Sequence, residues 1–150
     1  MGHGLPVALG IAFGQKKLDN LDMVYCIMSD GEVNEGTTWE SAMVAFHHNL
    51  HNVCVLVDRN KWQAMGRTDD VLMIEPLEEK FKAFGWDTQR IDGHNYKAIE
   101  KALKKNHKKP MVIICDTIKG KGVSFMEDSL VFHYKYVDDE TYKKAMEELT

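Results

Sequence analysis

The stretch VYCIMSDGEVNEGTTWE (residues 24–40) joins an apolar run, an acidic turn and the start of an amphipathic helix. The apolar run stops at Ser29, and Asp30, Gly31 and Glu32 follow directly. A nearly continuous apolar run of this length is typical of a strand covered on both faces, as in a parallel sheet. Ligands of open α/β sheets bind beyond the carboxyl ends of the strands, and Asp30 stands at such an end. The stretch therefore predicts a buried strand with a candidate ligand site after it.

Strand-like and helix-like segments alternate along the rest of the chain. The predicted strands are residues 23–28, 53–58, 86–91 (the weakest) and 111–117. The predicted helices are residues 4–17, 37–49, 77–84, 95–107 and 138–149. This order predicts the α/β class, with a doubly wound, mainly parallel sheet and helices on both faces, in a single domain over residues 1–150. Residues 118–137 show no clear periodicity, which indicates either a functional loop or an irregular surface excursion.

Composition narrows the class of protein. The chain has 150 residues, 44% apolar and 28% charged, with a net charge of −4, which is the balance of a soluble globular domain. An acidic balance does not favour a nucleic-acid or membrane-surface partner, and no apolar run approaches the roughly 20 residues of a membrane span. The lysines of residues 101–110 indicate a solvated helix end, with phosphate or RNA binding as the alternative.

The cysteines and tryptophans are expected in the interior. Cys26, Cys54 and Cys115 each lie within an apolar run and show no metal-binding spacing, so we interpret them as buried free thiols. Free thiols are typical of a reducing cytosol, which predicts a cytoplasmic protein. Trp39 and Trp86 are expected in the core rather than in a site.

A second polar residue follows the next predicted strand. Asn60 lies 30 positions after Asp30, about the length of a strand–helix–strand unit, so both side chains are expected at one edge of the sheet. Carboxylate and amide oxygens suit Mg²⁺ or Ca²⁺, and Mg²⁺ completes its shell with waters and phosphate oxygens. The pair thus predicts an anionic ligand such as a diphosphate, with Gly31 allowing close approach. A simple β-turn or helix cap at Asp30 and Gly31 remains the alternative.

These residues also resemble a known family. SDGEVNEG (residues 29–36) and NKWQAMG (residues 60–66) resemble the thiamine-diphosphate motif of transketolases. Three further segments are similar to the same family in order and spacing: MGHGLPVALGIAFG (1–14), LEEKFKAFGWDTQRIDGHN (77–95), and TIKGKGVSFMED (117–128) with FHYK (132–135). The resemblance covers essentially the whole chain and is greatest to the N-terminal subunit of the split, two-chain transketolases.

The resemblance implies a thiamine diphosphate-binding fold and roles for particular residues. Mg²⁺ would be held by Asp30, the side-chain oxygen of Asn60 and the backbone carbonyl of Trp62. Residues implied to contact the cofactor are Met1, Gly2, Gly31, Glu32, Asn60, Ala64 and His133. His133 is also implied to act on the sugar substrate, and Glu35 to join a carboxylate network across a dimer interface; these two are the implied catalytic residues. His3 and His94 are expected to have structural roles, as a helix-start and a turn residue.

The implied activity is transfer of a two-carbon ketol unit between sugar phosphates, as in the pentose phosphate pathway. It would use thiamine diphosphate and Mg²⁺ in a homo- or hetero-oligomer with a pyrimidine-binding C-terminal partner chain, so the isolated chain is expected to be inactive. Two alternatives stay open. The chain could be a catalytically inactive transketolase-like module, or part of another thiamine-dependent enzyme such as deoxyxylulose-phosphate synthase or a pyruvate dehydrogenase E1 component. The NEG of residues 34–36 and the segment 117–128 favour transketolase.

The chain departs from the family pattern in three respects. Ser29 replaces the first glycine of the motif and adds a side chain where the backbone would meet phosphate. Ala64 and Met65 replace an aliphatic residue and an aspartate, and a smaller residue at position 64 loses about 1 kcal/mol per missing methylene against the thiazolium ring. The match also begins within the family's diphosphate-binding domain, so the domain is expected to be incomplete at its N-terminus.

Overall fold

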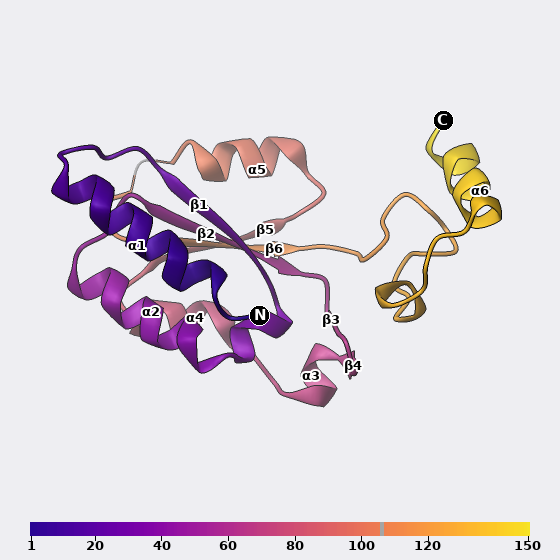
Figure 1. Cartoon of the computed structure of the whole chain (residues 1–150), viewed down its shortest axis with the longest axis horizontal. Helices are drawn as coiled ribbons and strands as arrows, with labels where there is room; N and C mark the ends of the chain where they lie inside the picture. The colour runs from indigo at the N-terminus through magenta and orange to yellow at the C-terminus, as the bar shows by residue number, and fades with distance from the viewer. Residues whose placement is uncertain (106) are drawn as a thin grey trace.

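A four-stranded parallel sheet forms the centre of the molecule in the computed structural model, which describes residues 1–105 and 107–150 (Figure 1). The strands, in their spatial order, are β1 (Val24–Ser29), β2 (Val53–Arg59), β6 (Met111–Asp116) and β5 (Asp87–Asp92). A short antiparallel hairpin follows β2 and consists of β3 (Trp62–Gln63) and β4 (Gly66–Arg67). The predicted parallel sheet is confirmed, and each of its strands lies within one residue of the predicted range.

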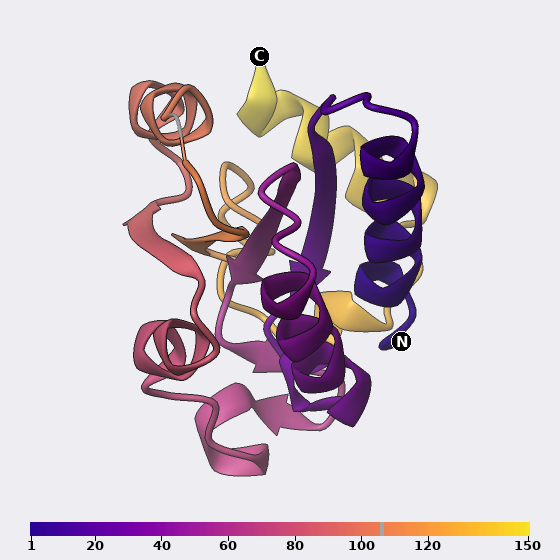
Figure 2. The ribbon, with the colours of Figure 1, turned by 90° about the vertical axis from the view of Figure 1, so that its left-hand side faces the viewer.

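Helices cover both faces of this sheet, as predicted. The helices on one face are α1 (Gly4–Lys17), α2 (Gly36–His47) and α4 (Leu77–Ala83), whereas α5 (Tyr96–Leu103) lies on the other (Figures 1 and 2). Short elements are η1 (Gly31–Asn34), α3 (Thr68–Val71) and η2 (Val131–His133), and α6 (Asp139–Leu149) ends the chain. The helix predicted at residues 95–107 is shorter than expected, and residue 106 lies outside the described residues.

Alternation along β2 and β6 fills two cores. Val53, Val55 and Val57 point into the larger cluster with α1, α2 and α4. Cys54 points the opposite way, into a smaller cluster with Ala102 of α5. Because β2 and β6 are the two inner strands of the sheet, both of their faces are buried. This confirms the sequence interpretation of the second and fourth apolar runs.

The first apolar run behaves differently, and the prediction that it is covered on both faces is wrong. Cys26 and Met28 are buried against α1, but Tyr25 and Ile27 on the opposite face are 52% and 77% exposed. The reason is topological, because β1 is an edge strand and α5 packs over the other side of the sheet, against β5. An apolar sequence pattern cannot distinguish an edge strand from an inner one.

The predicted interior residues are confirmed. Cys26, Cys54 and Cys115 are buried free thiols, and Trp86 is 3% exposed. Trp39 packs against the larger core from α2 and is partly buried.

Residues 118–137 leave the carboxyl end of β6 and extend, with α6, beyond the sheet (Figure 1). We call residues 118–137 the C-terminal strap. Its only regular element among the described residues is the short η2, as the aperiodic sequence predicted. None of the helices in the described part of the chain is long and apolar enough to cross a membrane.

Candidate functional site

Asp30 and Asn60 lie at the same edge of the sheet. In the parallel register Ser29 pairs with Asp58, so the chain leaves β1 and β2 side by side. The backbone N–H of Lys61 then donates a hydrogen bond of 2.8 Å to Oδ2 of Asp30. The two loops are therefore in direct contact, which is the convergence that the spacing predicted. Metal binding by these residues stays a prediction.

Asp30 is completely buried and is surrounded by hydrogen-bond donors. Besides the Lys61 N–H, its Oδ2 accepts from Thr68 Oγ1 at 2.9 Å and from Arg59 Nη1 at 3.3 Å. Its Oδ1 accepts from the backbone N–H of Gly31 at 2.8 Å. Burial raises the pKa of Asp30 above its usual range, and these donors oppose that rise without cancelling it. The site thus contains a desolvated carboxyl group with a cation against it.

That cation, Arg59, is a residue that the sequence interpretation missed. Its side chain is only 3% exposed and also contacts Asp69 at 2.9 Å and Glu75 at 3.3 Å. Glu75 in turn pairs with Arg90 at 2.9 Å. Although burial alone would raise the pKa of Glu75, hydrogen bonds from Arg90 and a backbone N–H lower it to about 2. The available signal was a charged residue at the end of an otherwise apolar run, which requires buried counter-charges.

The oxygen atoms at this edge fit a hard divalent cation. Asn60 Oδ1 accepts a hydrogen bond from the Trp62 N–H at 2.9 Å, while Nδ2 donates to Asp58 at 3.1 Å. Asp30 Oδ1 and Asn60 Oδ1 therefore accept one hydrogen bond each and retain a further lone pair. Such a set suits Mg²⁺, which needs few protein ligands. Within residues 1–105 and 107–150 no group of three or more His, Cys, Asp or Glu side chains could hold a metal.

The N-terminal segment reaches the same edge. The Gly2 N–H donates to Glu32 Oε1 at 2.9 Å, and the Gly2 carbonyl accepts from Thr37 Oγ1 at 2.7 Å. Gly2 has φ of +79°, and a Cβ there would lie 2.9 Å from Thr37 Oγ1, so only glycine fits without strain. Glu35 is exposed at the start of α2, and Met1 is 78% exposed. The structure thus brings Met1, Gly2 and Glu32 together beside Asp30.

The turn after β1 contains a serine and a glycine with different surroundings. Ser29 Oγ accepts a hydrogen bond of 3.1 Å from the Glu32 N–H, so the departure from the family pattern gives η1 a cap. Gly31 is covered by Gln63, because a Cβ on Gly31 would lie 3.1 Å from Gln63 Cγ. The sequence interpretation also missed Gln63, whose type and position in a short strand gave no signal by themselves.

The C-terminal strap is attached to the β3–β4 hairpin. Asp128 accepts from Trp62 Nε1 at 2.8 Å and forms two hydrogen bonds with Arg67, at 2.7 and 2.6 Å. The Arg67 guanidinium lies 3.9 Å from the Trp62 ring centroid, a cation–π contact. These donors lower the pKa of Asp128 to about 2. The strap therefore holds the loop that contains Asn60 and Trp62.

Tyr134 makes a second attachment between the strap and the hairpin. Its hydroxyl donates to the carbonyl of Ala64, and both residues are exposed. The His133 ring, also exposed, lies 4.9 Å from the Tyr134 ring centroid in an edge-on arrangement. The predicted residues Ala64 and His133 are therefore near each other. His94 is placed separately, where its Nε2 accepts from the Ile118 N–H at 2.8 Å, a structural contact as predicted.

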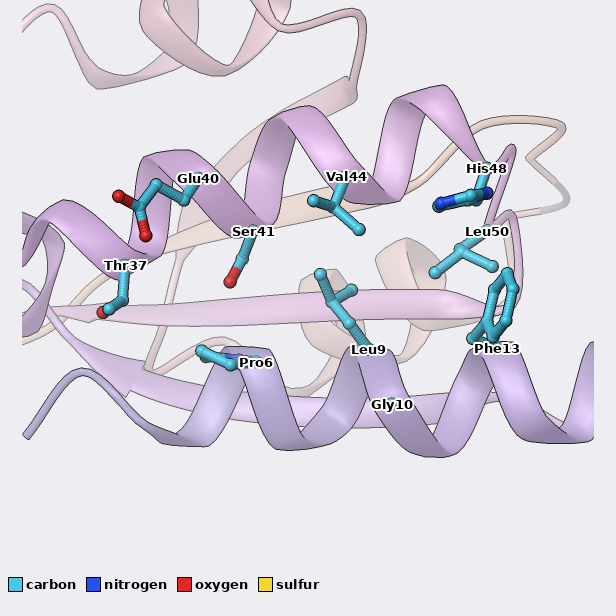
Figure 3. A pocket seen from close by; sticks show the side chains of 10 residues that line it. All are labelled: Pro6, Leu9, Gly10, Phe13, Thr37, Glu40, Ser41, Val44, His48 and Leu50. Atoms are coloured by element: carbon cyan, nitrogen blue, oxygen red, sulfur yellow. The ribbon is translucent and has the colours of Figure 1, made fainter.

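Two cavities differ in their chemistry. A polar cavity of about 570 Å³ lies beside Asn60, between the hairpin and the strap. An apolar groove of about 440 Å³ runs between α1 and α2, where Leu9 and Phe13 face Val44 (Figure 3). None of the residues predicted to bind cofactor or metal lines the groove. The polar cavity is the one that belongs to the candidate site.

Comparison with known proteins gives a consistent family. Residues 2–149 match the family described as "Transketolase, thiamine diphosphate binding domain". The chain is 37% identical to one of the two subunits of an apulose-4-phosphate transketolase of Actinobacillus succinogenes, over 99% of this chain and 55% of that protein. It is 42% identical to a 6-deoxy-6-sulfo-D-fructose transketolase subunit of a Clostridium species, over 99% of this chain and 55% of that protein. The chain thus spans about half the length of these curated relatives.

A solved structure shows the same fold. The transketolase of Campylobacter jejuni superposes with a TM-score of 0.92 at 32% identity, covering 99% of this chain and 25% of that one. Together with the match over residues 2–149, this shows that the chain belongs to the transketolase family and contains its thiamine diphosphate-binding domain.

Proposed function

We propose that this member of the transketolase family binds the diphosphate and Mg²⁺ of thiamine diphosphate and, with a pyrimidine-binding partner chain, transfers two-carbon ketol units between sugar phosphates. The observation that carries the proposal is the contact between the Asp30 carboxylate and the loop that contains Asn60 and Trp62, made through the Lys61 N–H at 2.8 Å. This contact brings oxygen donors from two strand ends to one edge, where α/β sheets bind anionic cofactors.

In this proposal Asp30 Oδ1, Asn60 Oδ1 and the Trp62 carbonyl hold Mg²⁺. The remaining positions of the ion are left for water and diphosphate oxygens, as Mg²⁺ prefers. The bound cofactor supplies the reactive thiazolium ring on which the carbon–carbon bond of the sugar is cleaved and remade. The protein side chains bind and orient the cofactor and its substrate.

The other predicted residues surround this centre. Gly31 and Glu32 lie in the turn that would face the diphosphate, and Gly2, bonded to Glu32, holds Met1 nearby. Ala64 at the hairpin turn would face the thiazolium ring, with less contact area than a larger aliphatic residue gives. His133, next to Tyr134 on the strap, would hydrogen-bond the cofactor or the sugar phosphate. Glu35, exposed at the start of α2, would act across an interface with a second chain.

The need for a partner is supported by the relatives. Two of them are named as subunits, and this chain matches about half of their length. The described residues provide an anion and metal site but show no second site for the pyrimidine end of the cofactor. We therefore propose a cytoplasmic oligomer in which the isolated chain is inactive and a pyrimidine-binding partner completes the catalytic centre.

Calorimetric titration with thiamine diphosphate and Mg²⁺ tests the binding part of the proposal. We expect weak, Mg²⁺-dependent binding that is lost in Asp30→Ala and in Asn60→Ala, the second variant being less disruptive because Asn60 is only partly buried. Asp116→Ala is the matched control, since Asp116 also ends a strand of the same sheet but contacts Arg90 instead. Tight binding without metal, or unchanged binding in both site variants, would refute the assigned roles.

Ketol transfer tests the catalytic part. With xylulose 5-phosphate as donor, we expect activity only when a pyrimidine-binding transketolase chain is added to this one. Turnover by the 150-residue chain alone would show that a partner is not required.

A further inference from the structure

A buried amide donor without a partner lies at the edge where the cofactor is proposed to bind. In the described part of the chain, the buried side-chain atoms without a hydrogen-bond partner are Gln15 Oε1, Asn52 Oδ1, Gln63 Nε2 and Thr88 Oγ1. Gln15 lies in α1, Asn52 precedes β2, and Thr88 lies in β5. Gln63 alone among these follows the carboxyl end of a sheet strand, between Trp62 and Ala64.

An unpaired buried N–H group destabilises a folded protein, because the group loses its hydrogen bonds to water and gains none. Such a group at a ligand-binding edge indicates an acceptor that arrives with the ligand. The acceptors of the protein nearby are already engaged, since both carboxylate oxygens of Asp30 accept hydrogen bonds from the surrounding donors. The missing acceptor is therefore expected to belong to a bound molecule.

The position of Gln63 identifies the part of the ligand that would supply this acceptor. The Gln63 side chain covers Gly31, with its amide carbon 3.4 Å from the position that a Cβ on Gly31 would occupy. Gly31 is the residue at which the diphosphate is proposed to approach the backbone. An amide N–H next to Gly31 would donate to an anionic oxygen, and hydrogen bonds to charged acceptors are stronger than those to neutral ones.

We propose that Gln63 is a binding residue for the diphosphate group, donating from Nε2 to one of its oxygens beside Gly31. This inference rests on the proposed function, because it requires that the anion at this edge is the diphosphate of the cofactor. It adds a neutral donor from the hairpin to the backbone of the β1 turn. The diphosphate would then be held between β1 and the hairpin that also contains Trp62.

Calorimetric titration of Gln63→Met tests the inference. Methionine keeps the length of the side chain and removes the amide, so we expect thiamine diphosphate with Mg²⁺ to bind on the order of tenfold more weakly. Thiamine without phosphates should bind the variant and the wild type equally. The thermal midpoint of the ligand-free variant should equal or exceed that of the wild type, because an unpaired donor has been removed.

Matched variants separate this role from a purely structural one. Gln15→Met removes another unpaired amide from α1, away from the site, and should leave cofactor affinity unchanged. Gln63→Glu puts a carboxylate beside the diphosphate and should weaken binding further, again only for the phosphorylated ligand. This second substitution keeps the test valid if the methionine variant folds poorly.

The outcomes distinguish the inference from the proposed function. If the wild type binds thiamine diphosphate and both Gln63 variants bind it equally well, the role of Gln63 is refuted while the proposed function stands. Equal losses for thiamine and for thiamine diphosphate would also refute the role, since the diphosphate would not be the group recognised. If the wild type itself does not bind the cofactor, both the proposed function and the inference fail.

Discussion

Replacing Arg59 by methionine tests the electrostatic organisation of the site. The Arg59 side chain is 3% exposed, and Asp30, its partner at 3.3 Å, is completely buried. Removing one partner of a buried ion pair leaves an uncompensated charge, which typically destabilises by about 3 to 5 kcal/mol. Asp30 keeps its hydrogen bonds from Gly31, Lys61 and Thr68. We therefore expect the lower end of that range, about 3 kcal/mol.

The measurement is urea unfolding followed by tryptophan fluorescence, together with the thermal midpoint. A loss of about 3 kcal/mol corresponds to a decrease of roughly 6 to 12 °C in the midpoint of a protein of this size. Arg67→Met is the matched control, because its ion pair with Asp128 is exposed at 39% and 52%. Exposed pairs contribute about 1 kcal/mol or less, so the control variant should unfold nearly as the wild type does.

A double variant identifies the partner responsible. In Asp30→Asn/Arg59→Met the buried charge is absent, so we expect this protein to be at least about 1 kcal/mol more stable than Arg59→Met alone. The reasoning is refuted if Arg59→Met costs less than the Arg67→Met control, or if the neutral asparagine restores no stability. In either case the buried pair would not organise the site.

Three further predictions concern other parts of the fold. The pKa of Glu75 is lowered to about 2 from an ordinary 4.5, so its contribution to stability is complete above about pH 4.5 and is lost as the pH falls towards 2; the stability difference between wild type and Glu75→Gln, from urea unfolding at several pH values, should shrink over that range, and a difference independent of pH would contradict this. Gly85 has φ of +84° and a Cβ there would lie 2.4 Å from the Phe46 ring, so Gly85→Ala should destabilise by about 1 to 2 kcal/mol in the same assay; Gly14→Ala, in α1 with open space around it, is the control and should be neutral or stabilising. Burial raises the pKa of Cys54 to about 12, so it should not react with a thiol reagent at mildly alkaline pH until the protein unfolds, and fast labelling of the native protein would disprove its burial.

Much of the fold could be predicted from local patterns. Helix α1 was predicted at residues 4–17 and is observed at Gly4–Lys17, because small and apolar residues recur there at helical spacing. The inner strands β2 and β6 were predicted as buried on both faces because their apolar runs are nearly continuous. The error on β1 has a simple cause. The same pattern occurs in an edge strand, and the exposure of Ile27 depends on how far the helices of the other face extend.

The sequence by itself determined where the strands end, and so which residues, Asp30 and Asn60, stand at the carboxyl edge of the sheet. This was possible because strand ends and residue spacing are local properties, and a parallel sheet brings successive strand ends to one side. Only the tertiary structure decided what those residues contact. The Arg59 guanidinium against Asp30, the unpaired amide of Gln63 beside Gly31 and the bond from Trp62 to Asp128, 66 positions away, all depend on strand order and side-chain packing. Long-range contacts of this kind form only when the whole chain is folded, so no local pattern contains them.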